Sequence, residues 1–240
     1  MLGLSRLGAC PSAFSEGRKC SAMRGRTGKG MNMSNMVVRI GMSMWIALLL
    51  TAVAVPAESA SASAALDNLI KAYDSESAAR AQCVAFAQKA DEEGYAKAAS
   101  LFRASARSLE VRLQHFKRVI SKMGGVPKAD IPKVEARSTR ENLELAMKEE
   151  ADRNGALYPA FVKQAKEEGA KGAVKTFNGA MRIGTGRSAL YGDALKRLEE
   201  MKGDAAEYYV CPVCGYLTDS GLFKKCPVCW TPRSKFEAIR

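Results

Sequence analysis

Two stretches of the chain share one pattern: Asn68-Leu-Ile-Lys-Ala-Tyr-Asp-Ser-Glu76 and Asn142-Leu-Glu-Leu-Ala-Met-Lys-Glu-Glu150. A second matched pair follows, residues 86–94 (FAQKADEEG) and 161–169 (FVKQAKEEG). The offset is 74 residues for the first pair and 75 for the second, so one residue is inserted between them in the later copy. A pattern that recurs at a fixed distance indicates that the same supersecondary unit occurs twice.

Each unit has the pattern of a helical hairpin. Apolar residues recur at spacings of three and four, as at Leu69, Ala72 and Tyr73, which is typical of one face of a helix. The Glu-Glu-Gly triplets at 92–94 and 167–169 predict helix ends with glycine just beyond the last turn. The next helix begins at once, so we expect the two helices of each unit to run antiparallel.

The two hairpins are joined by a segment rich in helix breakers. Residues 124–132 contain three Gly or Pro residues in their first four positions and a further Pro at the end, and Ser138 with Glu141 then predicts the start of the third helix. Two hairpins with one long connection predict a mainly α fold, a ferritin-like four-helix bundle over residues 63–203.

The tail, residues 204–240, carries two cysteine knuckles, Cys211-Pro-Val-Cys214 and Cys226-Pro-Val-Cys229. Two such turns can present four thiolates to one ion, which predicts a tetrahedral site for iron or zinc in a small metal-binding domain. Two disulfides in an oxidising compartment are the alternative. The doubled, proline-containing motif, with Gly215 after the first knuckle, favours the metal. We expect Trp230 and Phe236 to shield the knuckles from water.

The N-terminal part has the features of a targeting segment. In residues 36–62, Arg39 precedes an apolar run over 41–55, and the triplet 60–62 is a candidate cleavage site, which predicts a signal peptide and export to the periplasm. The run is short for a membrane span, so no stable membrane insertion is expected after cleavage, and an uncleaved anchor is the alternative. Residues 1–35 are expected to be a non-structural extension.

Composition limits the function further. The net charge is +12, of which residues 1–62 contribute +5 (seven Lys/Arg, two Asp/Glu). The remaining charges are interleaved along the predicted helices without an aromatic platform, so we expect no nucleic-acid partner. The sequence contains no phosphate loop, dinucleotide fingerprint or evident nucleophile–base pair.

Together, the repeat and the tail resemble the rubrerythrin family. The similarity covers residues 66–240 and rests on the helical motifs above and on a YxCPxCGY…CPxC ending. It implies a ferritin-like bundle followed by a rubredoxin-like domain with one mononuclear iron. In that family the bundle holds a di-iron centre that reduces hydrogen peroxide, and the rubredoxin iron passes it electrons. A redox protein as partner and a homodimer are further implications.

The chain departs from the family's di-iron ligands. Glu76 and Glu150 match the carboxylates of the first and third helices. The Glu-x-x-His motifs of the second and fourth helices, and the extra glutamate of the third, fall on other residues: Leu109 with Arg112, Gly184 with Arg187, and Arg153. The one histidine, His115, lies five residues after Glu110 and does not form the motif. Two carboxylates are too few ligands, which predicts that the di-iron centre is lost.

The substituted arginines suggest what replaces the metals. Buried carboxylates need a counter-charge, so we expect Arg112, Arg153 and Arg187 to pair with Glu76 and Glu150. The alternative is that these arginines extend to solvent.

The sequence thus favours an iron-binding electron-transfer protein that works through Cys211, Cys214, Cys226 and Cys229. Whether it is an enzyme stays open. A peroxidase with an atypical bundle site and a non-catalytic structural module with zinc in the four-cysteine site are the alternatives. Cys83, Tyr158 and Tyr191 are expected to pack in the bundle.

Overall fold

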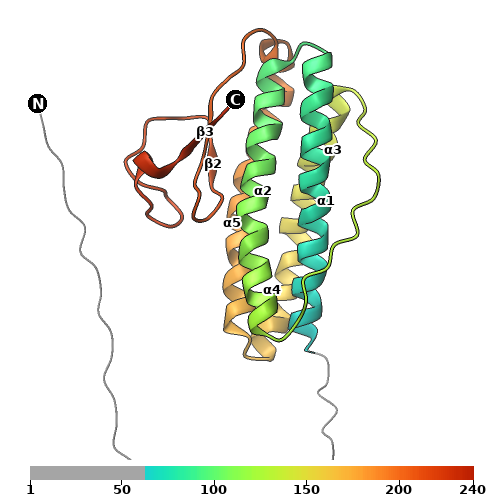
Figure 1. The fold of residues 1–240 in the computed structure, drawn as a ribbon, viewed down its shortest axis with the longest axis vertical. Helices are drawn as coiled ribbons and strands as arrows, with labels where there is room; N and C mark the ends of the chain where they lie inside the picture. The colour runs from blue at the N-terminus through green and yellow to red at the C-terminus, as the bar shows by residue number, and fades with distance from the viewer. Residues whose placement is uncertain (1–62) are drawn as a thin grey trace, which may run out of the picture. The chain divides into compact units, whose positions relative to one another are not determined.

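The computed structural model describes residues 63–240. The bundle consists of four long helical segments, which confirms the predicted fold class (Figure 1). In chain order the helices are α1 (Ala64–Glu92), α2 (Ala96–Lys122), α3 (Thr139–Asp152) continuing through η1 (Arg153–Leu157) into α4 (Tyr158–Glu167), and α5 (Lys171–Lys196). α1 packs against α2, and the composite third segment packs against α5.

The helix ends follow the sequence signals. Gly94 and Gly169 have positive φ angles of 80° and 67°, the left-handed conformation that ends a helix and that glycine adopts without strain. Ser138 and Glu141 form a reciprocal capping box at the start of α3, in which each side chain accepts from the other residue's backbone N–H.

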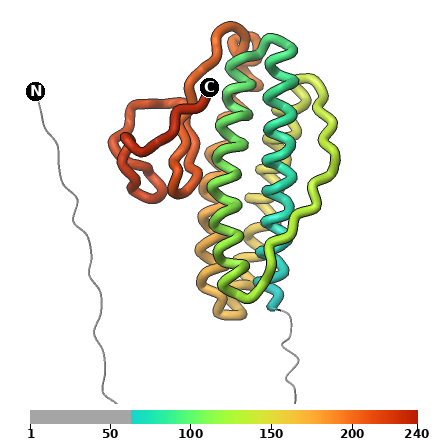
Figure 2. Tube along the Cα trace, viewed as in Figure 1, coloured from blue at the N-terminus to red at the C-terminus, as the bar shows by residue number. Residues whose placement is uncertain are grey.

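The connection between the hairpins, residues 123–138, contains no helix or strand. It runs along the bundle beside α1 (Figure 2). The N–H of Asp130 donates to Asp74 over 2.7 Å and holds the connection against α1, and just beyond its end the N–H of Thr139, the first residue of α3, donates to Glu93 over 2.8 Å.

The residue inserted in the second repeat coincides with a change of helix type. Between Glu150 and Phe161, where the offset grows from 74 to 75, the segment η1 forms a π-helix instead of an α-helix. A π turn accommodates an extra residue without breaking the helix, and such turns are frequent at functional sites. Here it lies directly beside the buried Glu150 and includes Arg153.

The bundle core is divided into two apolar clusters. One contains Phe86, Phe102 and Tyr191, and the other is built around Tyr158 and Phe177. The buried polar and charged side chains of the bundle include Glu76, Ser108, Arg112, Glu150, Arg153 and Arg187.

The tail forms a small three-stranded antiparallel sheet, with strand order β2-β1-β3. A short helix, η2 (Leu198–Met201), leads into β1 (Tyr208–Val210), β2 (Leu217–Thr218) and β3 (Glu237–Ile239), and η3 (Arg233–Lys235) precedes β3. The sheet lies beside α2 and α5 (Figure 1). Tyr208, Val210 and Leu217 join the core of the bundle, so the tail is packed onto the helices.

No helix within residues 63–240 is long and apolar enough to cross a membrane. The predicted signal peptide, residues 36–62, and the predicted extension, residues 1–35, lie outside the described residues.

Candidate metal centre

The four cysteines of the tail converge on one point. The Sγ atoms of Cys211 and Cys229 are 3.5 Å apart, those of Cys214 and Cys226 are 3.6 Å apart, and all four lie within 4.8 Å of one another. A disulfide would need about 2.05 Å between sulfurs, and the four thiols are free. Four metal–sulfur bonds of ~2.3 Å in a tetrahedron place the sulfurs roughly 3.8 Å apart. The cluster therefore fits a four-coordinate iron or zinc ion.

The thiols of Cys211 and Cys214 oppose each other's ionisation. A hydrogen bond from the Cys214 thiol lowers the pKa of Cys211 to about 4. The same hydrogen bond, together with burial, raises the pKa of Cys214 above its usual range. One thiolate thus holds the proton of its neighbour in place, and a bound metal ion would remove this conflict because it stabilises every thiolate.

Tight turns place the thiols of each knuckle. The N–H of Gly215 donates to the carbonyl of Cys211 over 2.9 Å, and the N–H of Trp230 donates to that of Cys226 over 3.0 Å. Both residues have positive φ, 85° for Gly215 and 64° for Trp230. Glycine suits this conformation and tryptophan does not, so the second knuckle is the more strained of the two.

Of the two aromatic residues expected to shield the cysteine knuckles from water, one does so. Phe236 is buried against Cys211 and Cys226 and packs edge-on to Phe223, with ring centroids 4.7 Å apart. Trp230 instead is 74% exposed, so the expectation that it covers the knuckles is wrong. It occupies the left-handed turn position, and its side chain faces solvent.

The first of the two matched carboxylates, Glu76, is buried in an ion pair. The Nε of Arg112 lies 3.1 Å from both carboxylate oxygens of Glu76, and the Tyr158 hydroxyl donates to Oε1 over 2.7 Å. Burial raises the pKa of Tyr158 well above its usual value, as does the nearby Glu76 charge, so the phenol keeps its proton and acts as a donor.

The second carboxylate, Glu150, lies between two guanidinium groups. Arg187 donates to its Oε1 from Nε over 2.9 Å and from Nη2 over 2.6 Å, and the Nη2 of Arg153 lies 3.1 Å from the same oxygen. Burial alone would raise the pKa of Glu150, but the charges of Arg187 and Arg153 outweigh it and hold the pKa below its usual value.

The positions that correspond to the glutamates of the two Glu-x-x-His motifs, Leu109 and Gly184, carry no polar side chain. Leu109 is buried in the apolar core. Gly184 faces the ion pair, and a Cβ at this position would lie 2.5 Å from Glu150 Oε2 and 2.7 Å from Asn154 Nδ2. The space of a side chain at position 184 is therefore taken by the Glu150 carboxylate and the Asn154 amide.

Ser108 connects the buried ion pair to the cysteine site, although no motif in the sequence marks it as functional. Its Oγ accepts a hydrogen bond from Arg187 Nη1 over 3.0 Å and donates to the carbonyl of Gly215 over 2.5 Å. Gly215 is packed tightly here, since a Cβ would lie 2.7 Å from the Ser108 carbonyl oxygen. In the sequence, the glycine directly after the first knuckle is the one signal of this close contact.

Two further contacts fix the tail on α2. His115 Nε2 lies 2.7 Å from the carbonyl of Val213, inside the first knuckle. Arg107 forms a two-pronged ion pair with Glu237, with distances of 2.6 and 2.9 Å. His115 is thus half-buried and bonded to the backbone of the knuckle.

Comparison with known proteins agrees with this architecture. The family models described as Rubrerythrin and as Rubrerythrin, rubredoxin-like domain match residues 67–182 and 209–237. The nigerythrin of Nitratidesulfovibrio vulgaris is 32% identical over 174 residues, which cover 72% of this chain and 85% of the relative. The rubrerythrin of Porphyromonas gingivalis is 32% identical over 186 residues, covering 72% and 88%.

Comparison with solved structures also supports this fold. A nigerythrin structure in a mixed-valence state matches with a TM-score of 0.66 at 32% identity, covering 72% of this chain and 86% of that one. Mycobacterium tuberculosis bacterioferritin BfrA, with a TM-score of 0.53 at 16% identity, shares the fold alone. The two matched domains, the relatives at 32% identity and the four-cysteine cluster together show that this chain belongs to the rubrerythrin family.

Proposed function

We propose that this protein transfers single electrons through one iron ion in the four-cysteine site, and that its bundle no longer holds an iron pair. Family membership and the geometry of the cysteine cluster support an iron-binding redox protein. A related nigerythrin structure is described as fully reduced and all ferrous, so that relative holds iron.

The observation that carries the proposal is the counter-charge on both matched carboxylates. Glu76 is paired with Arg112, and Glu150 is paired with Arg187 and Arg153. Metal cations at these carboxylates would have to displace the guanidinium groups or lie against them. Among residues 63–240, the four cysteines form the one cluster of three or more candidate ligand residues.

The cysteine site has the features of an electron-transfer centre. A bound iron ion would supply one-electron chemistry, and four protein thiolates leave no open coordination position for a substrate. The protein provides the rigid turns and backbone N–H groups directed at sulfur, such as that of Val228, which lies 3.4 Å from Cys226 Sγ. Val213 and Trp230, beside the knuckles, are exposed and offer an apolar edge to a redox partner protein.

A spectroelectrochemical titration of the full chain, produced with iron available, tests this function. We expect thiolate-to-iron absorption bands in the oxidised form that bleach reversibly with one electron per chain. Reaction of the reduced protein with hydrogen peroxide should be no faster than that of a matched rubredoxin-like centre without a bundle. A colourless protein with one zinc ion would instead indicate the structural module, and rapid peroxide turnover would indicate the atypical peroxidase.

Export to the periplasm and dimerisation stay part of the proposal. Both rest on the sequence, through residues 36–62 and through the family resemblance respectively.

A further inference from the structure

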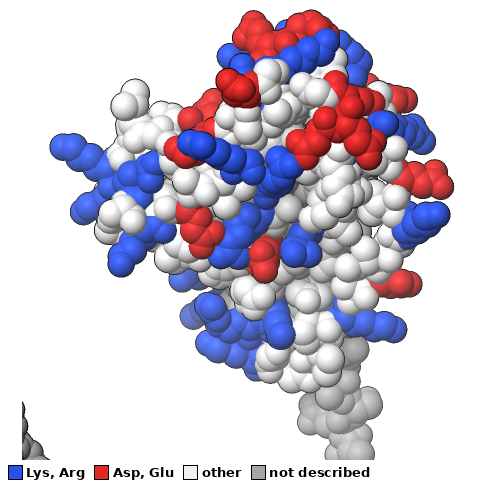
Figure 3. Space-filling view, turned by 45° about the horizontal axis from the view of Figure 1, so that its top comes forward, with Lys and Arg blue, Asp and Glu red and all other residues white. Residues whose placement is uncertain are grey.

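A basic cleft opens between α2 and α5, directly under the cysteine knuckles, with a volume of about 580 Å³. Its positive residues come from both helices: Arg112 and Arg118 from α2, Lys175 and Arg182 from α5. None of the described residues that line it is acidic. In Figure 3, basic side chains gather on the flank below the tail domain, whereas acidic side chains are concentrated at the other end of the bundle.

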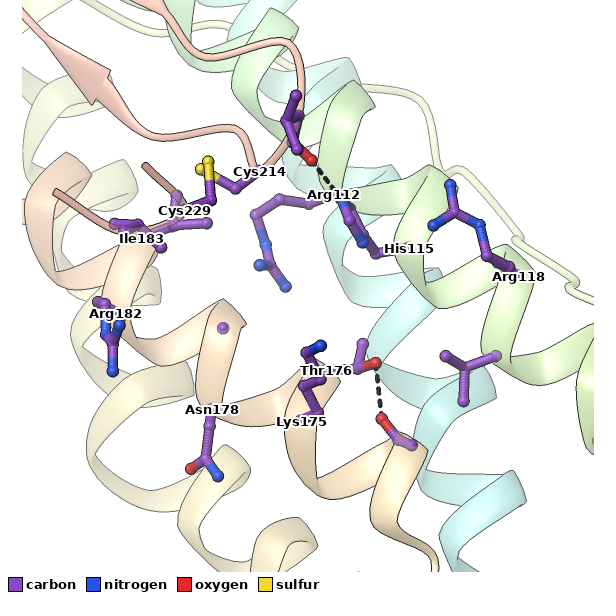
Figure 4. A pocket seen from close by; sticks show the side chains of 15 residues that line it. Arg112, His115, Arg118, Lys175, Thr176, Asn178, Arg182, Ile183, Cys214 and Cys229 are labelled. Atoms are coloured by element: carbon purple, nitrogen blue, oxygen red, sulfur yellow. Dashed lines mark hydrogen bonds between the residues drawn. The ribbon is translucent and has the colours of Figure 1, made fainter. Parts of the chain in front are cut away.

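The deepest of these residues, Arg112, is not fully satisfied. Its side chain is 3% exposed, and its guanidinium group points into the cleft below Cys214 and Cys229 (Figure 4). Nε is bonded to Glu76, but the buried Nη2 has no hydrogen-bond partner in the described part of the chain. A buried donor without a partner destabilises the folded protein, and an oxyanion in the cleft would stabilise the same guanidinium group through Nη1, the nitrogen nearest Gly179.

The cleft is shaped to let a ligand approach this arginine. Gly179 faces the guanidinium group, and a Cβ there would lie 3.9 Å from Arg112 Nη1, so larger side chains would fill the floor. Lys175 extends into the same space from α5 (Figure 4). Val119 and Ile183 add apolar wall, and the volume lies within the roughly 300–1,000 Å³ range of small-molecule sites.

We propose that this cleft binds a phosphate-bearing small molecule, up to the size of a mononucleotide, with a phosphate oxygen at Arg112 and the organic part against the apolar wall. Several cations and no lining acid favour a ligand with more than one negative charge. A small molecule fits better than an acidic protein loop, because Arg112 is almost completely buried where it lines the cleft.

The site would also be coupled to the metal centre, an extension that rests on the proposed function. Cys214 and Cys229 line the cleft, so its occupant lies beside the thiolates. A reduced iron–tetrathiolate centre carries one more negative charge than the oxidised one. An anion in the cleft should therefore bind more weakly to the reduced protein and, by reciprocity, lower the reduction potential.

Titration calorimetry on the full, metal-loaded chain tests the site, with pyrophosphate and ADP as probes. We expect saturable binding of one molecule per chain that weakens with added salt. Lys175→Gln should weaken binding about tenfold, equivalent to ~1.4 kcal/mol. Lys196→Gln is the matched control, since it removes the same charge from an exposed position on the same helix and should leave binding unchanged.

Gly179→Leu gives a second test that does not depend on removing charge. The added side chain should fill the floor of the cleft and abolish binding, while replacing a helical glycine should not lower the melting temperature. The proposal is overturned if neither probe saturates, if the Lys175 and Lys196 variants lose affinity equally, or if only a polyglutamate peptide binds. Zinc-loaded protein, whose site has the same charge as the reduced iron site, should bind the probes as the reduced protein does. Failure of the cleft is therefore separable from failure of the electron-transfer function.

Discussion

The buried pair of Glu150 and Arg187 gives the sharpest test of the charge-replacement account. Arg187→Met keeps the volume and removes the charge from a position that is 1% exposed. Breaking a buried ion pair by deleting one partner costs about 3–5 kcal/mol, because it leaves a buried charge uncompensated. Since Arg153 still lies 3.1 Å from the same oxygen of Glu150, we expect a loss near the lower end, about 3 kcal/mol.

The free energy of unfolding, from urea titration followed by circular dichroism at pH 7, measures this loss. Lys196→Met is the matched control: it deletes an exposed partner of Asp193 on the same helix and should cost less than about 0.5 kcal/mol. In the double variant Glu150→Leu/Arg187→Met, most of the stability should return, because no buried carboxylate is left to compensate and Arg153 keeps Glu149 as a partner at 3.6 Å. A loss below about 1 kcal/mol for Arg187→Met, or a double variant as unstable as the single one, would refute the reasoning.

Three further predictions concern the same region and the cysteine site. Gly184→Ala should lower the free energy of unfolding by about 1–3 kcal/mol, because the added methyl group would overlap Glu150. Gly186→Ala, in open space on the same helix, should raise it by roughly 0.5–1 kcal/mol. Equal effects of the two variants in urea titration would contradict the close contact between Gly184 and Glu150. Because the folded pKa of Glu150 is lowered, its ionisation stabilises the fold above the unfolded pKa of about 4.3, and this contribution is lost as the pH falls through the folded pKa. The stability gap between the natural protein and Glu150→Gln should therefore narrow below about pH 4, and a constant gap would count against it. Cys226→Ser should abolish the bound metal while the helical circular dichroism persists; retained metal at natural stoichiometry would exclude the four-cysteine site.

The helical repeat made the fold predictable, because two matched hairpins with a breaker-rich link leave few ways to bury four apolar faces. The inserted residue of the second copy was visible as a change of offset. Its conformation was not predictable, since a π turn and a loop residue are alike in sequence. The structure places it at residues 153–157, where it includes Arg153.

The ion pairs in the bundle could be predicted from the sequence, but the hydrogen bonds that connect them to the cysteine site could not. Arginines at the positions of missing ligands suggested the pairs with Glu76 and Glu150, which the structure forms. The role of Ser108 depends on Gly215 and Arg187 meeting in space, far apart in the chain, and no local pattern reveals it. Trp230 has a positive φ angle and is exposed, and no local sequence pattern predicts a tryptophan in that conformation.

The ratio of iron to protein in the full chain, produced with iron in excess and measured by elemental analysis, tests the central claim most directly. The account predicts one iron per chain, lost completely in Cys226→Ser and unchanged in Glu76→Gln and Glu150→Gln. Three irons per chain, or iron that is lost when either glutamate is changed, would show that the bundle still holds a metal pair and would contradict the account.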